Sequence, residues 1–126
     1  MMLKSSSVVG FVGTAKPDEA RTFYEQCLGL KLLEDSPFAF VFESGCTTIR
    51  VQKVESLLAH QHTALGWVVS DITTTVQHLA SSGVKFQHFE HLPQDELGIW
   101  QTPDGSQVAW FQDPDGNVLS ITEHVS

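Results

Sequence analysis

The stretch Gln101–Asn117, QTPDGSQVAWFQDPDGN, contains the tripeptide Pro-Asp-Gly twice, first at Pro103 and again at Pro114. Proline fixes φ, aspartate accepts hydrogen bonds from the local backbone, and glycine tolerates a positive φ, so each copy predicts a tight turn. The segments between and after the turns, SQVAWFQ and NVLSITEH, are rich in apolar and β-branched residues. This end of the chain therefore predicts strands joined by hairpins.

In the N-terminal half, the residue pattern predicts a strand, a helix and three further strands. Pro17 suits the first turn of the helix, and Gly29 is a natural end for it. The apolar face of this helix follows helical spacing and consists of Ala20, Phe23, Tyr24, Cys27 and Leu28. The expected strands are SVVGFVG (7–13), LKLLED (30–35), PFAFVFE (37–43) and TTIRVQKV (47–54).

The second half repeats this order of elements. Asp71 can cap a helix that Gly83 ends, and the apolar face of that helix consists of Ile72, Val76, Leu79 and Ala80. The expected strands are HTALGWVVS (62–70), VKFQHF (84–89), ELGIWQT (96–102), SQVAWFQ (106–112) and NVLSITEH (117–124). The repetition predicts two βαβββ modules, at about 7–54 and 62–124 of one domain spanning 1–126, with an extra strand in the second.

The composition excludes several classes of partner. The formal net charge is −8, with 15 acidic against 7 basic side chains and no cluster of lysine or arginine, so we expect neither nucleic acid nor an anionic membrane as partner. No apolar run approaches the roughly 20 residues that a membrane helix needs. Cys27 in the helix and Cys46 in a turn do not form a disulfide framework, so we expect reduced thiols and a cytoplasmic protein.

Two segments resemble a known family. FYEQCLGLKLL (23–33) and FQDPDGNVLSITE (111–123) resemble the signatures of the vicinal oxygen chelate superfamily, which includes glyoxalases, extradiol dioxygenases and bleomycin resistance proteins. The likeness extends from about Val8 to Glu123. It implies an α+β fold in which two tandem βαβββ modules form a curved mixed sheet, a cup that holds a ligand, with the helices on the outside. It also implies a homodimer.

The resemblance further implies four metal-ligand positions, one on the first and one on the last strand of each module, which fall at Val9, Arg50, Ala64 and Ser120. Thr48 is the alternative to Arg50 as the position on the first module's last strand. Valine and alanine cannot bind a metal ion, serine is a weak ligand, and arginine adds a positive charge. No cofactor is therefore predicted.

His60 and His62 provide the alternative, a divalent metal with relocated ligands. If the strand near Ala64 extends backwards, both imidazoles face the pocket side with it. The other interpretation places this H-Q-H segment on the surface or at the rim of the cup, without a metal.

Five residues are candidates for ligand binding. An inward-pointing Arg50 requires an anion, either a ligand carboxylate or phosphate or a protein acid: Glu43, Glu96 or Glu123. Glu96 and Trp100 place an acid beside an indole, which suits a cationic or planar ligand. Trp110 and Phe111 point to opposite sides, so one of them lines the pocket. Phe40 belongs to a row, Phe38, Phe40 and Phe42, that either lines the cup or packs under the helices.

Two functions follow from these observations, and the sequence does not decide between them. The acidic charge, the aromatic strands and the missing metal ligands favour a metal-free small-molecule binding protein with an acidic, aromatic cup, similar to the bleomycin-binding branch. The alternative is a metal-dependent glyoxalase-like lyase, isomerase or dioxygenase. Whether the protein is an enzyme stays open at this point, as does the identity of its ligand.

Overall fold

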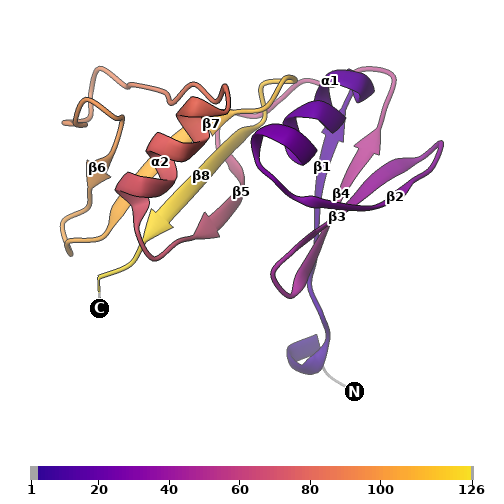
Figure 1. The fold of residues 1–126 in the computed structure, drawn as a ribbon, viewed down its shortest axis with the longest axis horizontal. Coiled ribbons are helices and arrows are strands. Elements are labelled where there is room, and N and C mark those ends of the chain that lie inside the picture. The colour runs from indigo at the N-terminus through magenta and orange to yellow at the C-terminus, as the bar shows by residue number, and fades with distance from the viewer. Residues whose placement is uncertain (1–2, 126) are drawn as a thin grey trace. The chain divides into compact units, whose positions relative to one another are not determined.

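The structure, a computed structural model, describes residues 3–125, in which helices and strands form two compact units (Figure 1). We call them unit 1 (Met1–Leu58) and unit 2 (Ala59–Ser126). Each unit contains one four-stranded mixed sheet, so the prediction of an α+β fold with two tandem modules is confirmed. None of the described helices is long and apolar enough to cross a membrane.

Unit 1 has the predicted order of elements. A short 3-10 helix, η1 (Leu3–Ser5), precedes β1 (Val9–Thr14), α1 (Pro17–Thr22), η2 (Phe23–Cys27), β2 (Lys31–Asp35), β3 (Ala39–Ser44) and β4 (Thr47–Lys53). The strands pair in the order β1-β4-β3-β2, with β1 parallel to β4 and the other pairs antiparallel. The predicted first helix ends in a π-helical turn, because the N–H of Leu28 donates to the carbonyl of Phe23 (2.9 Å) and Gly29 then adopts a φ of 75°.

One face of the unit 1 sheet is covered by the helix, and on that face lies the core. The Tyr24 ring is fully buried and lies 5.8 Å from the ring of Phe42, which in turn lies 6.3 Å from the ring of Phe40. Ile49 is paired with Phe42 and is also buried. The predicted row of three phenylalanines is therefore wrong in one member: Phe38 precedes β3 and is 74% exposed, because β3 begins only at Ala39.

Unit 2 contains β5 (Thr63–Val68), α2 (Ile72–Ser81), β6 (Trp100–Gln101), β7 (Gln107–Gln112) and β8 (Val118–Glu123). Its strand order, β5-β8-β7-β6, repeats that of unit 1, with β5 parallel to β8. The extra strand predicted around Ile99 is present as the short β6, whereas the strand predicted over 84–89 is wrong. Residues 84–89 form only an isolated bridge from Phe86 to Phe111, since the chain leaves β7 after the N–H of Gln87 donates to the carbonyl of Trp110 (2.8 Å).

Helix α2 packs on one face of the unit 2 sheet (Figure 1) through the predicted apolar positions Ile72, Val76 and Leu79, which are buried. The fourth predicted position, Ala80, is exposed. The predicted cap is confirmed, because Asp71 Oδ1 accepts from the N–H of Thr74 (3.1 Å). A second carboxylate, Glu123 at the end of β8, accepts from the N–H of Ile72 (2.8 Å). The N-terminus of α2 is thus held by two acids, as the helix dipole favours.

Both Pro-Asp-Gly copies form the predicted turns, Thr102–Ser106 before β7 and Asp113–Asn117 before β8. In each turn, the first residue accepts from the N–H of the glycine and donates to the carbonyl of the last residue, at 2.7–3.0 Å. Gly105 and Gly116 have φ values of 95° and 89°, which only glycine adopts without strain. The repeated tripeptide therefore shapes two hairpins of the second sheet.

Candidate functional site: an aromatic face on unit 2

The sheet of unit 2 has a second face, which α2 does not cover. Strand alternation and register place one set of side chains there: Gly66, Val68, Trp100, Val108, Trp110, Ser120 and Thr122. We call this side the open face of unit 2. The neighbouring positions, such as Phe111 and Leu119, point to α2 and are fully buried. The open face is therefore the side of this sheet that α2 leaves uncovered, and it is the candidate site.

Three aromatic rings gather on the open face, and we call them the aromatic platform: Phe89, Trp100 and Trp110. The two indoles are stacked, with ring centroids 6.1 Å apart and an interplanar angle of 29°. The Phe89 ring meets Trp110 edge-on at 5.5 Å. All three rings are partly exposed. Offset stacks of this kind extend naturally to one more planar ring, which a ligand can supply.

The structure also settles the choice between Trp110 and Phe111. Trp110 lies on the open face, as its pairing with Ser120 requires. Phe111 is fully buried on the helix side, where Trp67 stacks on it at 6.5 Å. Trp67 therefore lies on the helix-facing side of β5, where it is partly exposed.

The loop between α2 and β6 holds Phe89 in place through one side chain, Gln94. Its amide group donates to the carbonyls of Gln87 (2.9 Å) and Gly98 (2.8 Å), and its oxygen accepts from the N–H of Phe89 (2.6 Å). Gln87 lies opposite Trp110, and its own side-chain oxygen is buried without a hydrogen-bond partner among the described residues. The sequence-based candidates do not include Gln87, Phe89 or Gln94. The local pattern that points to Phe89 is the strand-like segment 84–89, in which Phe86 and Phe89 fall on opposite sides.

A hollow of about 450 Å³ adjoins the platform, because it shares Val108 and Thr122 with the open face. Its remaining lining residues come from the first hairpin turn and the C-terminus: Thr102, Pro103, Asp104, Ser106 and His124. Hydrogen bonds from the Thr102 hydroxyl and the Ser106 N–H lower the pKa of Asp104 below its usual value. The hollow therefore contains a carboxylate that stays ionised at neutral pH.

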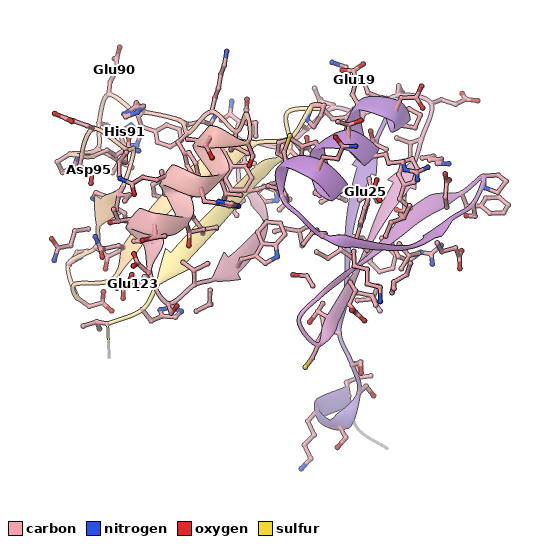
Figure 2. The ribbon with its side chains drawn as sticks, viewed as in Figure 1. Glu19, Glu25, Glu90, His91, Asp95 and Glu123 are labelled. Atoms are coloured by element: carbon pink, nitrogen blue, oxygen red, sulfur yellow. The ribbon has the colours of Figure 1, made fainter. Side chains whose placement is uncertain are left out.

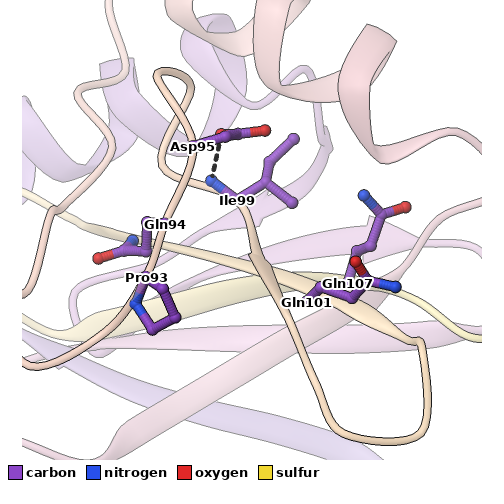
Figure 3. Close-up of a pocket in the computed structure, with 6 residues that line it drawn as sticks. All are labelled: Pro93, Gln94, Asp95, Ile99, Gln101 and Gln107. Carbon is purple, nitrogen blue, oxygen red and sulfur yellow. Dashed lines mark hydrogen bonds between the residues drawn. The ribbon is translucent and has the colours of Figure 1, made fainter.

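A smaller cavity of about 250 Å³ lies at the edge of the same unit, lined by Pro93, Gln94, Asp95, Ile99, Gln101 and Gln107 (Figure 3). Asp95 is engaged there in its own turn, since its Oδ1 accepts from the N–H groups of Leu97 and Ile99, both at 2.9 Å. Gln101 and Gln107 are a cross-strand pair on the opposite side from Trp100. This cavity is thus separate from the platform.

Two of the candidate residues lie away from the platform. Phe40 is 3% exposed, in the core under the unit 1 helix, so it does not face a ligand from the open side of its sheet. Glu96 is exposed in the turn that follows Asp95, and it makes no hydrogen bond or ion pair with another described residue. The acid that adjoins the open face is Asp104, from a turn that sequence reasoning had interpreted only as structural.

In unit 1, the open face is the side of the sheet that its helix does not cover, and it includes Val9, Phe11, Val41, Glu43, Thr48 and Arg50. Arg50 lies on the interior strand β4, directly opposite Phe11 of β1 and Val41 of β3. Side chains alternate along β4, since Ile49 and Val51 are buried while Arg50 and Thr48 are on the other face.

The side chains at the four metal-ligand positions do not fit a metal ion. Val9 and Ala64 are exposed apolar residues, Arg50 carries a positive charge, and Ser120 offers a single hydroxyl. Among residues 3–125, no group of three or more His, Cys, Asp or Glu side chains is arranged to hold one. In unit 2, for example, Glu123 lies well apart from Glu90, His91 and Asp95 (Figure 2).

The alternative ligands, His60 and His62, are exposed in the loop before β5, which begins only at Thr63. Their rings stack with centroids 5.0 Å apart. The backward extension of the strand, which would have turned both imidazoles to one side with Ala64, is therefore wrong.

A comparison with known families agrees with this architecture. A family model described as Glyoxalase/Bleomycin resistance protein/Dioxygenase superfamily matches residues 8–121. The chain belongs to this superfamily. The resemblance seen in the helix-to-strand and DPDGN segments is thereby confirmed. No curated protein sequence matches the chain.

Solved structures of superfamily members share the fold at low sequence identity. A glyoxalase family protein from Bacillus anthracis has a TM-score of 0.75 and 17% identity, with 96% of each chain covered. TnmS3, an antibiotic binding protein from Streptomyces sp. CB03234, has a TM-score of 0.72 and 20% identity, covering 99% of this chain and 100% of that one. A lactoylglutathione lyase from Agrobacterium tumefaciens has a TM-score of 0.69 and 16% identity, covering 94% and 93%. Binding proteins and enzymes thus share this fold, so function must come from the side chains.

Proposed function

We propose that this superfamily member is a small-molecule binding protein that captures a planar aromatic ligand on the open face of unit 2, without a metal ion. The observation that carries the proposal is the stacked, partly exposed pair Trp100 and Trp110, flanked by Phe89. A planar ring added to the end of this stack buries the apolar area of one face and gains favourable ring contacts. The side chains at the four family metal positions support the metal-free part of the proposal.

The adjoining hollow narrows the ligand further. Asp104 stays ionised beside the open face, and the chain carries a net charge of −8, so a positively charged group on the ligand is favoured both locally and at long range. The existence of an antibiotic binding protein with this fold, TnmS3, agrees with such a role. The ligand class we propose is therefore a planar aromatic cation.

The test is a titration of the protein with proflavine, a planar aromatic cation, in which isothermal calorimetry measures the binding affinity. A Trp110→Leu variant should bind it about tenfold more weakly or worse, because one aromatic stack contributes about 1.5 kcal/mol. Trp67→Phe is the matched control, since Trp67 lies on the helix side of the same sheet, stacked on Phe111 and away from the open face. Equal affinities for the wild type and Trp110→Leu, or no saturable binding of proflavine to the wild type, would contradict the proposal.

A metal-dependent lyase, isomerase or dioxygenase is the second candidate, and the stacked pair His60 and His62 favours it. Elemental analysis of untagged protein tests this candidate directly. One equivalent of Mn, Fe, Ni or Zn per chain that is lost in His62→Ala would support the enzyme and refute the metal-free site. The homodimer and the cytoplasmic location stay predictions; sedimentation equilibrium checks the first, and imaging of the tagged protein in cells checks the second.

A further inference from the structure

The chain has two arginines, both in unit 1, and their surroundings differ. The Arg21 guanidinium is exposed and already paired, with Glu25 at 3.5 Å and Asp35 at 3.1 Å. Arg50 is partly buried, and among residues 3–58 no carboxylate lies within 4.0 Å of its guanidinium. Its guanidinium donates no hydrogen bond to any described residue. A partly buried cation without a partner is unfavourable unless something else supplies the anion.

The position of Arg50 in the sheet makes it a suitable anchor. Strand β4 is paired on both sides, so the backbone under Arg50 is fixed by β1 and β3. The residues directly opposite are apolar: Phe11, which is 53% exposed, and Val41. Val9, one position along the same face of β1, is 42% exposed. The two side chains paired directly with Arg50 thus offer apolar contact area to a ligand, and neither of them can accept a hydrogen bond from the guanidinium.

We propose that Arg50 binds the carboxylate of an organic acid whose apolar part packs on Phe11. The planar guanidinium presents parallel N–H donors that match the two oxygens of a carboxylate. Such charge-assisted hydrogen bonds are stronger than hydrogen bonds between neutral groups. The exposed apolar side chains beside it favour an acid with a hydrocarbon or aromatic body over a bare inorganic anion. This inference concerns unit 1 alone and does not rest on the ligand proposed for unit 2.

The protein acids that sequence reasoning offered as partners do not fill this role. Glu43 shares the open face, but it pairs with Thr48, it is exposed, and its carboxylate is beyond 4.0 Å from the guanidinium. Glu123 is occupied in unit 2 by the N–H of Ile72. An exposed carboxylate also gains little from an ion pair, because water already solvates it. Arg50 is thus left available to an external anion.

The net charge of −8 makes the test specific. Such a protein repels anions at long range, so saturable binding of one requires a local site. We suggest titrating ¹⁵N-labelled full-length protein with sodium benzoate and following the Nε–Hε resonances of both arginines by NMR. The neutral isostere benzamide and inorganic phosphate are titrated in parallel at equal ionic strength.

The expected result is a saturable benzoate shift at Arg50 and none at Arg21, with benzamide and phosphate at least tenfold weaker. Arg50→Gln should weaken benzoate binding at least tenfold, as read from the shift of the Phe11 amide. Arg50→Lys keeps the positive charge but loses the two parallel N–H donors, so its affinity for benzoate should lie between those of the wild type and Arg50→Gln. Arg21→Gln is the matched control and should leave the affinity unchanged. Melting temperatures and dispersed spectra verify that each variant is folded.

Three outcomes would overturn the proposal. Benzoate that binds Arg50→Gln as well as wild type would show that the anion sits elsewhere, and benzamide that binds as well as benzoate would show that charge plays no part. A large loss of thermal stability in both Arg50→Gln and Arg50→Lys, without benzoate binding to the wild type, would show that Arg50 serves the fold instead.

Discussion

The side chain of Gln94 is expected to hold the loop that carries Phe89, and its removal gives the sharpest test of the site. Gln94→Ala deletes three hydrogen bonds, to the carbonyls of Gln87 and Gly98 and from the N–H of Phe89. All three are partly buried, and each such bond contributes about 1 kcal/mol to stability. We therefore expect unit 2 to lose about 3 kcal/mol of unfolding free energy, or its 87–98 loop to become locally disordered.

Urea unfolding followed by tryptophan fluorescence measures this loss, because all three tryptophans, at positions 67, 100 and 110, lie in unit 2. Gln101→Ala is the control, since Gln101 lies just after the loop, is exposed, and makes no side-chain hydrogen bond to a described residue. Hydrogen exchange at the Phe89 amide distinguishes global destabilisation of unit 2 from local opening of the 87–98 loop. If Gln94→Ala and Gln101→Ala differ by less than about 0.5 kcal/mol and Phe89 keeps its protection, the role assigned to Gln94 is wrong.

Two further predictions concern the sheet and helix that support the open face. Replacement of Gly66 by alanine would place a methyl group 2.7 Å from Ser120 Oγ, so Gly66→Ala should lower the free energy of unfolding by about 1–3 kcal/mol. Most of this loss should vanish in a Ser120→Ala background, because the clashing oxygen is gone. Additive effects of the two substitutions in a double-mutant cycle would contradict this explanation. The N–H and hydroxyl of Thr74 lower the pKa of Asp71 below its ordinary value of 3.8. Because the pKa of Asp71 is lower in the folded protein than in the unfolded chain, its ionised carboxylate stabilises the fold above pH 3.8. This stabilisation is lost as the pH falls through the pKa of Asp71 in the folded protein. Acid titration of thermal stability should therefore show a weaker low-pH dependence in Asp71→Asn than in wild type.

The sequence predicts those parts of the fold that local chemistry determines. Pro17 and Gly29 bound the first helix, and Asp71 begins the second, because caps and φ preferences act within a few residues. The failures lie where distant contacts decide. Residues 84–89 have a strand-like pattern, yet they make only one bridge, because the loop after Gln87 is tied to Gln94 by a side chain that no periodicity reveals.

The same limit applies to the candidate site. Period-two alternation places Trp110 and Phe111 on opposite faces, but it does not say which face the helix covers. That choice depends on the register with β8, where Trp110 meets Ser120 and Phe111 meets Leu119. Trp100 was a candidate because the sequence places an indole near Glu96, and the structure places its ring beside that of Trp110. Phe89 was not, because its place on the platform depends on the path of a loop.

The segment that identifies the superfamily has a structural role that its own hydrogen bonds explain. Asp113 is 5% exposed, and its carboxylate accepts from the N–H groups of Asp115 and Asn117 and from the Asn117 side chain, at 2.8–3.0 Å. All of these bonds lie within the turn before β8, so the DPDGN motif specifies a hairpin and the start of the last strand. The strand that it starts then presents Ser120 at a family metal position, where only a weak ligand results. A sequence can therefore keep the DPDGN motif while the family metal position, three residues after Asn117, is occupied by a residue of any type. For this chain, the functional proposals therefore rest on the aromatic platform and on Arg50 rather than on the motif that names the family.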